Sequence, residues 1–536
     1  MSRHHTRNIR RYLAGNTQPF FLAKRRKVWE RNARWLSKGT ELNVVKSPLA
    51  MATGLLLGLR LICAFLVELT PQEAYYWNYA LHPALSYFDH PPGVAWVIRA
   101  GYWLFGKSEL GVRIGGIVLT VFSTWLLYAL GKLWFNKKSG LWAAFLFQAV
   151  PLFFVYGMLI TPDVPLAFFW LLTLYLVSVA VREARGGFWY LGGVALGFCL
   201  LSKYTAAFLV PATLLFLSFD RRYRFWLLRI EPYGALIIAL ILFTPVILWN
   251  SEHQWASFAF QVGDRLGQEA NGSLHRIGEF LLIQLGVTSP LFLVGLLLVT
   301  AIPFSFPSKE QRGGWRFALL FAAPLLMFLL VYSGRSAVKA NWPLPGYLSL
   351  LVATYPAYRY LRFRSAARQK TAARYFLIFW LSLLPFLYCV ALYHSTVTLP
   401  YVKTHHWTTG WRDLGRIVGQ EARSFELESN QKVFLLGMDS HYIASALSFY
   451  SDETFPVFSR NLIGRSALAF AYWKPTMNLV GLNALAVDID TPNLRTLRRY
   501  FARVEEPVQR VPVMRRGRLL YYAYLIKCYD YKGRGL

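Results

Sequence analysis

The sequence predicts a mainly α-helical protein that crosses a membrane about eleven times and ends in a small α/β domain. Three observations support this fold class. Of the 536 residues, 55% are hydrophobic and only 16% are charged, whereas about a quarter of the residues of a soluble domain carry charge. Apolar runs, each close to the roughly 20 residues that cross a bilayer, recur between residues 49 and 394. The basic residues gather in the short segments between these runs, as they do in cytoplasmic loops.

The same distribution of charge accounts for the net charge of +31. In a soluble protein such a charge would indicate nucleic-acid binding, but here it sets membrane topology, and we expect no nucleic-acid partner. Residues 1–48 form a basic arm that we place in the cytoplasm, because it is too long and polar for a cleavable signal peptide. The four cysteines are far apart and show neither a disulfide framework nor the spacing of metal ligands.

The apolar runs define the expected order of membrane spans. The first, 49–68, leads to the outer face, where residues 69–108 form an external segment with an amphipathic helix over 93–105. Further spans are expected at 110–134, 140–159, 164–181, 188–202, 205–219, 232–249, 278–302, 317–333, 346–360 and 376–394. Because every loop that this topology places inside is basic, the order agrees with the positive-inside preference.

Residues 395–536 are expected to form a separate α/β domain on the outer face. The apolar stretches KVFLLG and LNALAVDI predict strands, and helical patterns fall at 411–423 and 441–449. The stretch LLYYAYLIKCY near the end is expected to complete the sheet. The chain therefore divides into the arm, a membrane domain over 49–394, and this outer domain.

The most informative segment is the polar stretch 70–92, TPQEAYYWNYALHPALSYFDHPP, which we expect to be a loop at the outer membrane face. Its carboxylates, Glu73 and Asp89, are costly so close to hydrocarbon, which indicates a functional use. Its aromatic residues suit either an interfacial belt or a surface for stacking sugars. The residues of this stretch that we expect to position a substrate are Tyr76, Trp77 and His90.

Basic residues on the outer face run against the topological preference and need another explanation. Each could snorkel to lipid headgroups, but together they favour an anion site in which several cations grip a phosphate. The cations chosen for this role are Arg113, Lys203, Arg265 and Lys339, with Asn341 and Trp342 of the turn NWPLPGY positioning the substrate. Asp163 in TPDVP lies on the same face; it is either catalytic or part of a helix N-cap.

The segments EAYYWNYALHPALSYFDHPP, GKSELGVRIGG, TPDVPL and ALGFCLLSKYTA together resemble the bacterial family 39 glycosyltransferases of GT-C type. These are relatives of the protein O-mannosyltransferases and of the lipid A aminoarabinose transferase, and the resemblance covers about residues 50–450. It implies a GT-C-like fold in a bacterial inner membrane. It also implies transfer of a sugar from polyprenyl (undecaprenyl) phosphate to lipid A, a glycan or a protein on the periplasmic side. Family members use an acidic pair in the first external loop, but here Gln72 replaces the first acid and only Glu73 remains.

Sugar transfer needs a base for the acceptor hydroxyl and cations for the leaving phosphate. We favour Glu73 as the base of an inverting single displacement, with Asp89 orienting the acceptor or a metal, and with Asp89 or Asp163 as alternative bases. Lys203, Arg265 and Lys339 would stabilise the phosphate, and Arg113 would assist. A divalent ion held by Glu73, Asp89 and His90 is an open alternative, because carboxylate sites of this kind bind such ions loosely.

Two other functions compete with the transferase. A translocator of lipid-linked sugars would also need spans and outer cations, but it would show paired broken helices or internal repeats, and the sequence has neither. A catalytically inactive scaffold would explain Gln72 directly. Turnover of a lipid-linked sugar by the wild-type protein separates both from the transferase.

Overall fold

The computed structural model describes residues 47–264, 274–288, 309–364, 409–473, 475 and 477–533. From Thr53 onward the chain forms one compact unit. By length and composition, five described helices can cross a membrane, and a sixth crossing results if one bent pair of helices forms a single span. The prediction of a mainly helical, multi-pass protein is therefore confirmed. The end of the predicted span 278–302 and all of 376–394 lie outside the described residues, so the total of eleven stays a prediction.

The helices of the membrane part follow the apolar runs of the sequence. The five helices that can cross a membrane are α4 (Pro48–Leu66), α7 (Glu109–Trp134), α10 (Asp163–Glu183), α13 (Ile230–Glu252) and α17 (Lys309–Ser333). The others are α5 (Pro71–Leu81), α6 (Gly93–Phe105), α8 (Lys137–Ala149), α9 (Pro151–Met158), α11 (Gly187–Leu200), η1 (Tyr204–Phe208), α12 (Leu209–Phe219), η2 (Arg224–Leu228), α14 (Ala256–Ala259), η3 (Phe260–Asp264), α15 (Leu274–Thr288) and α18 (Leu344–Arg364).

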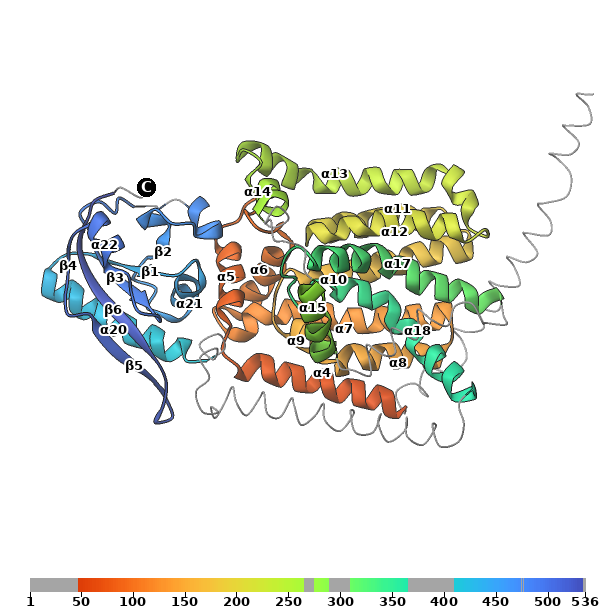
Figure 1. Cartoon of the computed structure of the whole chain (residues 1–536), viewed down its shortest axis with the longest axis horizontal. Coiled ribbons are helices and arrows are strands. Elements are labelled where there is room, and N and C mark those ends of the chain that lie inside the picture. Colours follow the sequence, from red (N-terminus) through yellow and green to blue (C-terminus); the bar gives the residue numbers. More distant parts are fainter. Residues whose placement is uncertain are drawn as a thin grey trace, which may run out of the picture. The chain divides into compact units, whose positions relative to one another are not determined.

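These helices pack closely along their lengths (Figure 1). Helix α11 lies against α10 and α13, α7 lies against α8, and α17 lies against α18. A Cβ atom at Gly193 of α11 would clash with the backbone of Ala235 in α13, so this contact requires glycine. The core between the helices contains large aromatic side chains such as Trp170 and Trp315, which are fully buried.

The predicted span 140–159 consists of two helices. Helix α8 ends at Ala149 and α9 begins at Pro151, and the two axes differ in direction by 68°. Pro151 explains the break, because proline lacks the N–H that would continue α8 and its ring clashes with the preceding turn. After this bent pair the chain enters α10 at Asp163.

The polar stretch 70–92 begins with a helix, α5, and the expectation of a loop was wrong for this part. The Thr70 hydroxyl accepts a hydrogen bond from the Glu73 N–H, and the Glu73 carboxylate accepts one from the Thr70 N–H. This capping box is a strong helix start, and Pro71 suits the first turn because no partner is needed there for an N–H. The letters TPQE contain this signal, which the loop prediction overlooked.

The C-terminal domain contains a sheet with the strand order β2-β1-β3-β6-β4, and β5 also pairs with β6. Strand β1 is parallel to β2 and β3, whereas β6 is antiparallel to β3, β4 and β5. Its elements are α20 (Trp411–Ser429), β1 (Val433–Gly437), α21 (Tyr442–Tyr450), β2 (Val457–Ser459), η6 (Arg460–Ile463), η7 (Leu468–Tyr472), β3 (Asn483–Asp488), α22 (Leu494–Tyr500), β4 (Phe501–Val504), β5 (Gln509–Arg515) and β6 (Arg518–Tyr531).

Helices cover both faces of this sheet. Leu435 packs with α20 and α21 on one face, and its neighbour Phe434 packs with α22 on the other. Every residue of β1 is buried, which is typical of a parallel strand between two helical layers. The predicted strands and helices of this domain are confirmed, while its predicted start at residue 395 lies outside the described residues.

Candidate active site

Glu73, the residue predicted to be the catalytic base, is completely buried in an ion pair with Arg113 of α7. Arg113 Nε lies 2.7 Å from Glu73 Oε1, and Arg113 Nη2 lies 2.7 Å from Oε2. The Ile160 N–H also donates to Oε1, at 3.2 Å, and the Thr70 N–H to Oε2, at 2.9 Å. Both carboxylate oxygens are thus occupied by protein donors.

Arg113, predicted to bind the donor phosphate, is likewise completely buried. Besides Glu73, its guanidinium donates to the carbonyl oxygens of Ala64, Val67 and Glu68, at 3.1, 2.6 and 2.9 Å. These carbonyls belong to the end of α4 and the turn that follows it. The pair therefore joins α4, α5 and α7, and the charge of Arg113 is already neutralised by Glu73.

Asp89 lies on the other side of α5, where two tyrosines hold its carboxylate. Asp89 Oδ1 accepts hydrogen bonds from the hydroxyls of Tyr75, at 2.8 Å, and of Tyr79. Burial and the nearby carboxylate raise the pKa of both tyrosines well above the ordinary value, so the phenols remain donors at neutral pH. Asp89 is thus a buried carboxylate with a fixed orientation.

His90 and Tyr76 complete this cluster. His90 Nε2 is 3.9 Å from Asp89 Oδ2, and the His90 ring meets the edge of Tyr76 at 5.8 Å between centroids. The metal site considered for Glu73, Asp89 and His90 is not formed, since no three His, Cys, Asp or Glu side chains gather to hold a metal within the residues that the structure describes.

Asp163, Lys203 and Asn341 form a second cluster, which unites three residues that the sequence selected separately. Lys203 Nζ lies 2.7 Å from Asp163 Oδ1, and Asn341 Nδ2 donates to Asp163 Oδ2 at 2.7 Å. All three side chains are buried. Asp163 is the first residue of α10, but no side chain caps that helix, so the alternative role of an N-cap is not found.

The two clusters lie on neighbouring segments. The N–H of Gly93, shortly after Asp89, donates to the carbonyl of Leu201, shortly before Lys203, at 2.8 Å. Asp89 also acts electrostatically on Tyr204, the residue next to Lys203. Asp89 and Lys203 are therefore held near one another by the backbone.

The remaining predicted residues lie around these clusters. The positive charge of Lys339 helps to lower the pKa of His441 in the C-terminal domain, which burial chiefly lowers to about 3. The Trp342 ring stacks on Tyr332, with centroids 6.1 Å apart, and the Trp77 ring meets the edge of Phe449 at 5.0 Å. Arg265 lies outside the described residues.

The C-terminal domain contributes contacts that the sequence did not reveal. The N–H of Ala469 donates to the Tyr75 hydroxyl at 3.1 Å, and the His441 ring lies 4.6 Å from the Tyr75 ring. The Glu68 carboxylate, directly after α4, accepts the N–H groups of Gly410 and Trp411 at the start of α20, at 3.0 and 3.1 Å. A carboxylate is favourable at a helix N-terminus. The signal in the sequence that could have identified Glu68 is the position of this carboxylate just after the first span.

A cavity of about 600 Å³ opens at residues 81–88, the segment that precedes Asp89 in the chain. It lies between residues 81–88, the end of α13 and η7. Its lining includes Tyr87, Phe88, Trp249, Tyr472 and Trp473, together with the polar side chains of His82, Glu252 and His253. Aromatic faces with a few polar groups around them are the usual composition of a small-molecule site.

Comparisons with known proteins agree with this description. Residues 89–249 match the family model for dolichyl-phosphate-mannose-protein mannosyltransferase. The lipid A galacturonosyltransferase RgtD of Rhizobium johnstonii is 22% identical over 280 residues, which are 52% of this chain and 58% of that protein. An undecaprenyl phosphate-alpha-4-amino-4-deoxy-L-arabinose arabinosyl transferase of Pseudomonas paraeruginosa is 32% identical over 170 residues, 30% of each chain. The matched residues thus span somewhat more than half of the length of the galacturonosyltransferase and under a third of the length of the arabinosyl transferase.

The fold has a solved counterpart. The crystal structure of ArnT from Cupriavidus metallidurans, bound to undecaprenyl phosphate, superposes with a TM-score of 0.61 and 16% identity, and covers 91% of this chain and 98% of ArnT. The protein therefore has the membrane fold of the GT-C class. Within that class it is related to the protein O-mannosyltransferases and to the lipid A aminoarabinose transferase, as the sequence motifs predicted.

Proposed function

We propose that this protein transfers a sugar from a polyprenyl phosphate carrier, of the undecaprenyl type, to a hydroxyl group of an acceptor on the membrane face that carries the C-terminal domain. The observation that carries the proposal is the pairing of two buried polar clusters, Asp89 with its tyrosines and Asp163 with Lys203 and Asn341, on adjacent segments. A base and a phosphate-binding cation are the two elements that such a transfer needs.

Asp89 is the base in this proposal, in place of Glu73. The oxygens of Glu73 are occupied by Arg113 and two backbone N–H groups, so an acceptor hydroxyl has no access to them. Gln72, which stands where the family has its first acid, shares a helical face with Tyr75, Tyr76 and Tyr79. Asp89 lies on that same face of α5. Asp89 therefore provides a carboxylate on the side of the helix where the first acid of the family's pair would stand.

Lys203 is the proposed ligand of the donor phosphate. A lysine ammonium has three protons, and one of them is directed to Asp163. Asp163 fixes the ammonium in place while its other protons can reach a phosphate oxygen. Lys339, and Arg265 outside the described residues, stay proposed as further cations of this site.

The reaction follows from these positions. The acceptor hydroxyl gives its proton to Asp89, and its oxygen attacks the anomeric carbon of the donor sugar. The bond between that carbon and the phosphate oxygen breaks, and polyprenyl phosphate leaves with the bonding electrons while Lys203 stabilises its charge. A single displacement of this kind inverts the anomeric configuration.

The test uses purified protein in lipid nanodiscs, with undecaprenyl phosphate sugars and extracted envelope acceptors. Release of undecaprenyl phosphate, followed by mass spectrometry, is expected to need both partners. Asp89→Asn is expected to lower the rate about 100-fold or more without changing the melting temperature. Full turnover in Asp89→Asn would remove Asp89 from the role of base. Absence of release with every donor would refute the transferase.

A further inference from the structure

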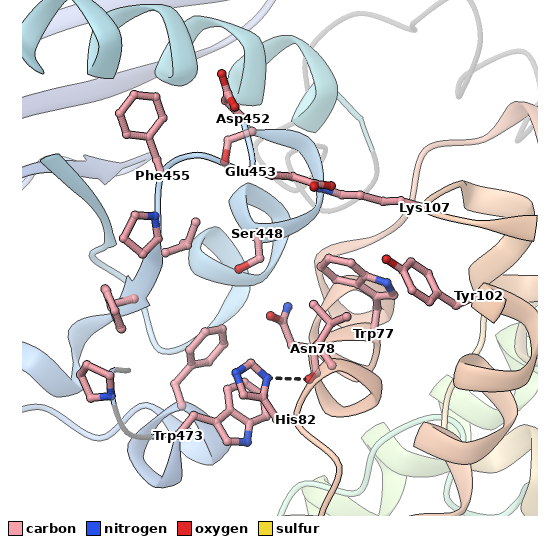
Figure 2. Close-up of a pocket in the computed structure, with 17 residues that line it drawn as sticks. Trp77, Asn78, His82, Tyr102, Lys107, Ser448, Asp452, Glu453, Phe455 and Trp473 are labelled. Atoms are coloured by element: carbon pink, nitrogen blue, oxygen red, sulfur yellow. Dashed lines mark hydrogen bonds and ion pairs between the residues drawn. The ribbon is translucent and has the colours of Figure 1, made fainter. Parts of the chain in front are cut away.

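A second cavity, of about 430 Å³, lies between α5 and the C-terminal domain (Figure 2). Figure 2 shows Trp77 and Asn78 of α5 on one side and Ser448 and Glu453 of the C-terminal domain on the other. Trp77 lies on the side of α5 away from Tyr75 and Tyr79, the tyrosines that hold Asp89, and together with Asn78 it lines this cavity. The mechanism proposed above does not use it.

One stacked pair separates this cavity from the cavity at residues 81–88. His82 and Trp473 line both cavities, and their rings lie parallel, 4.4 Å apart with an interplanar angle of 9°. The His82 Nδ1 atom lies 2.9 Å from the carbonyl oxygen of Asn78, which fixes the ring against α5. The two cavities therefore form neighbouring compartments with a shared aromatic wall.

The lining of both compartments suits carbohydrate. A sugar ring has an apolar face of C–H groups, which packs on aromatic rings, and a rim of hydroxyls, which needs donors and acceptors. Trp77 and Trp473 provide rings in the second cavity, and Trp249 and Tyr472 provide them in the first. Asn78 and Ser448 add an amide and a hydroxyl at the same site.

The charges of the lining disfavour an anionic ligand. Lys107 is the lysine of the second cavity's lining, and it is already paired with Glu453 at 2.8 Å. The first cavity contributes the carboxylate of Glu252. Burial lowers the pKa of His82, so its imidazole is neutral at neutral pH and adds no positive charge.

We infer that the acceptor is an uncharged oligosaccharide that lies across the His82–Trp473 pair, with one sugar unit in each compartment. This inference rests on the proposed transferase, because it places the reacting hydroxyl in the compartment lined by residues 81–88, which lead directly to Asp89 in the chain. The second compartment then selects acceptors of at least two sugar units.

The experiment measures binding without any donor, on the full chain in nanodiscs. The probes are maltotriose and chitotriose, compared with trigalacturonate, and the readout is quenching of tryptophan fluorescence. Trp473→Ala is expected to weaken binding of the uncharged trisaccharides about tenfold, with partial recovery in Trp473→Phe. Glu453→Gln is expected to weaken it several-fold. Glu428→Gln is the matched control. Like Glu453, Glu428 is an exposed carboxylate of the C-terminal domain that pairs with a lysine, here Lys527 at 2.6 Å, but it lines neither cavity.

Weaker binding in the Trp473 and Glu453 variants, with Glu428→Gln unchanged, supports the inference. Equal binding by all variants, tighter binding of trigalacturonate, or no binding of either uncharged probe at millimolar concentration would overturn it. The proposed transferase fails differently, through absence of undecaprenyl phosphate release from a protein that still binds the trisaccharides.

Discussion

Replacement of Glu73 by glutamine separates a structural role from a catalytic one. Each carboxylate oxygen of Glu73 accepts two hydrogen bonds from protein donors. Oε1 accepts from Arg113 Nε and the Ile160 N–H, and Oε2 accepts from Arg113 Nη2 and the Thr70 N–H. In either orientation the new amide NH₂ would face two of these donors. The variant thus leaves two buried donors without acceptors and a buried guanidinium without its counter-charge.

The expected cost follows from these contacts. A buried donor without an acceptor costs about 1–3 kcal/mol, and removal of one partner of a buried ion pair costs about 3–5 kcal/mol. These terms overlap, so we expect Glu73→Gln to lower the free energy of unfolding by about 3–5 kcal/mol, which corresponds to a decrease of the melting temperature on the order of 5 °C. The double variant Glu73→Gln/Arg113→Gln is expected to lose less than the sum of the two single variants, because the unpaired charge is then absent.

A thiol-reactive dye provides the assay. The three cysteines within the described residues, Cys63, Cys199 and Cys528, are buried and become reactive on unfolding. Turnover is measured in parallel at a temperature where each variant is folded. An unchanged melting temperature with abolished turnover would refute the reasoning and restore Glu73 as the base. Asp89→Asn is the contrasting control, expected to keep the melting temperature and lose turnover.

Three further predictions concern other parts of the molecule. Asp163→Asn removes the charge that holds Lys203, so the KM for the lipid donor is expected to rise about tenfold with a smaller change for the acceptor; equal changes for both substrates in steady-state kinetics would contradict this role. Burial raises the pKa of Asp488 to about 6. Ionisation of Asp488 therefore destabilises the folded domain at pH values above about 6, progressively less between about pH 6 and 4, and not at all below about pH 4. Asp488→Asn keeps the oxygen that accepts the N–H groups of Ile489 and Asp490. In thermal unfolding this variant is therefore expected to be more stable than the wild type by on the order of 3 kcal/mol at pH 7, and equally stable near pH 3.5. A stability gain independent of pH would contradict the assignment. Gln72→Asp is expected to change turnover less than about tenfold, because Asp89, the proposed base, lies on that side of α5. Activity that appears only in this variant would identify the wild type as an inactive relative.

The sequence predicted the features that depend on neighbouring residues. The apolar runs gave the membrane helices, and the alternation of KVFLLG and LNALAVDI with helical patterns gave the C-terminal domain, because burial is encoded locally by periodicity. The helix α5 was also encoded locally, in the capping box of Thr70 and Glu73, and was missed only because the polar composition of the stretch was read as a loop.

The partners of the charged residues could not be predicted in this way. Glu73 and Arg113 are 40 residues apart, and Asp163 and Asn341 are 178 apart. A carboxylate at the membrane surface has the same local sequence whether a buried arginine neutralises it or a substrate reaches it. Only the packing of α7 against the turn after α4 decides that Glu73 is paired and that Asp89, held by two tyrosines, is the carboxylate on the other side.

The arrangement around α5 gives a physical reason why glutamine at position 72 is compatible with transferase chemistry. The N-terminus of the helix is fixed by Arg113 through Glu73, and one face holds Asp89 through Tyr75 and Tyr79. Trp77, on the far side of the helix, lines the second cavity together with Asn78. A second carboxylate at position 72 would stand on the Asp89 face and would raise the pKa of that base by repulsion between like charges. The neutral amide of Gln72 exerts no such repulsion on Asp89. The pH profile of turnover should therefore have its acidic limb at lower pH in the wild type than in Gln72→Asp, and coincident limbs would show that position 72 does not communicate with Asp89.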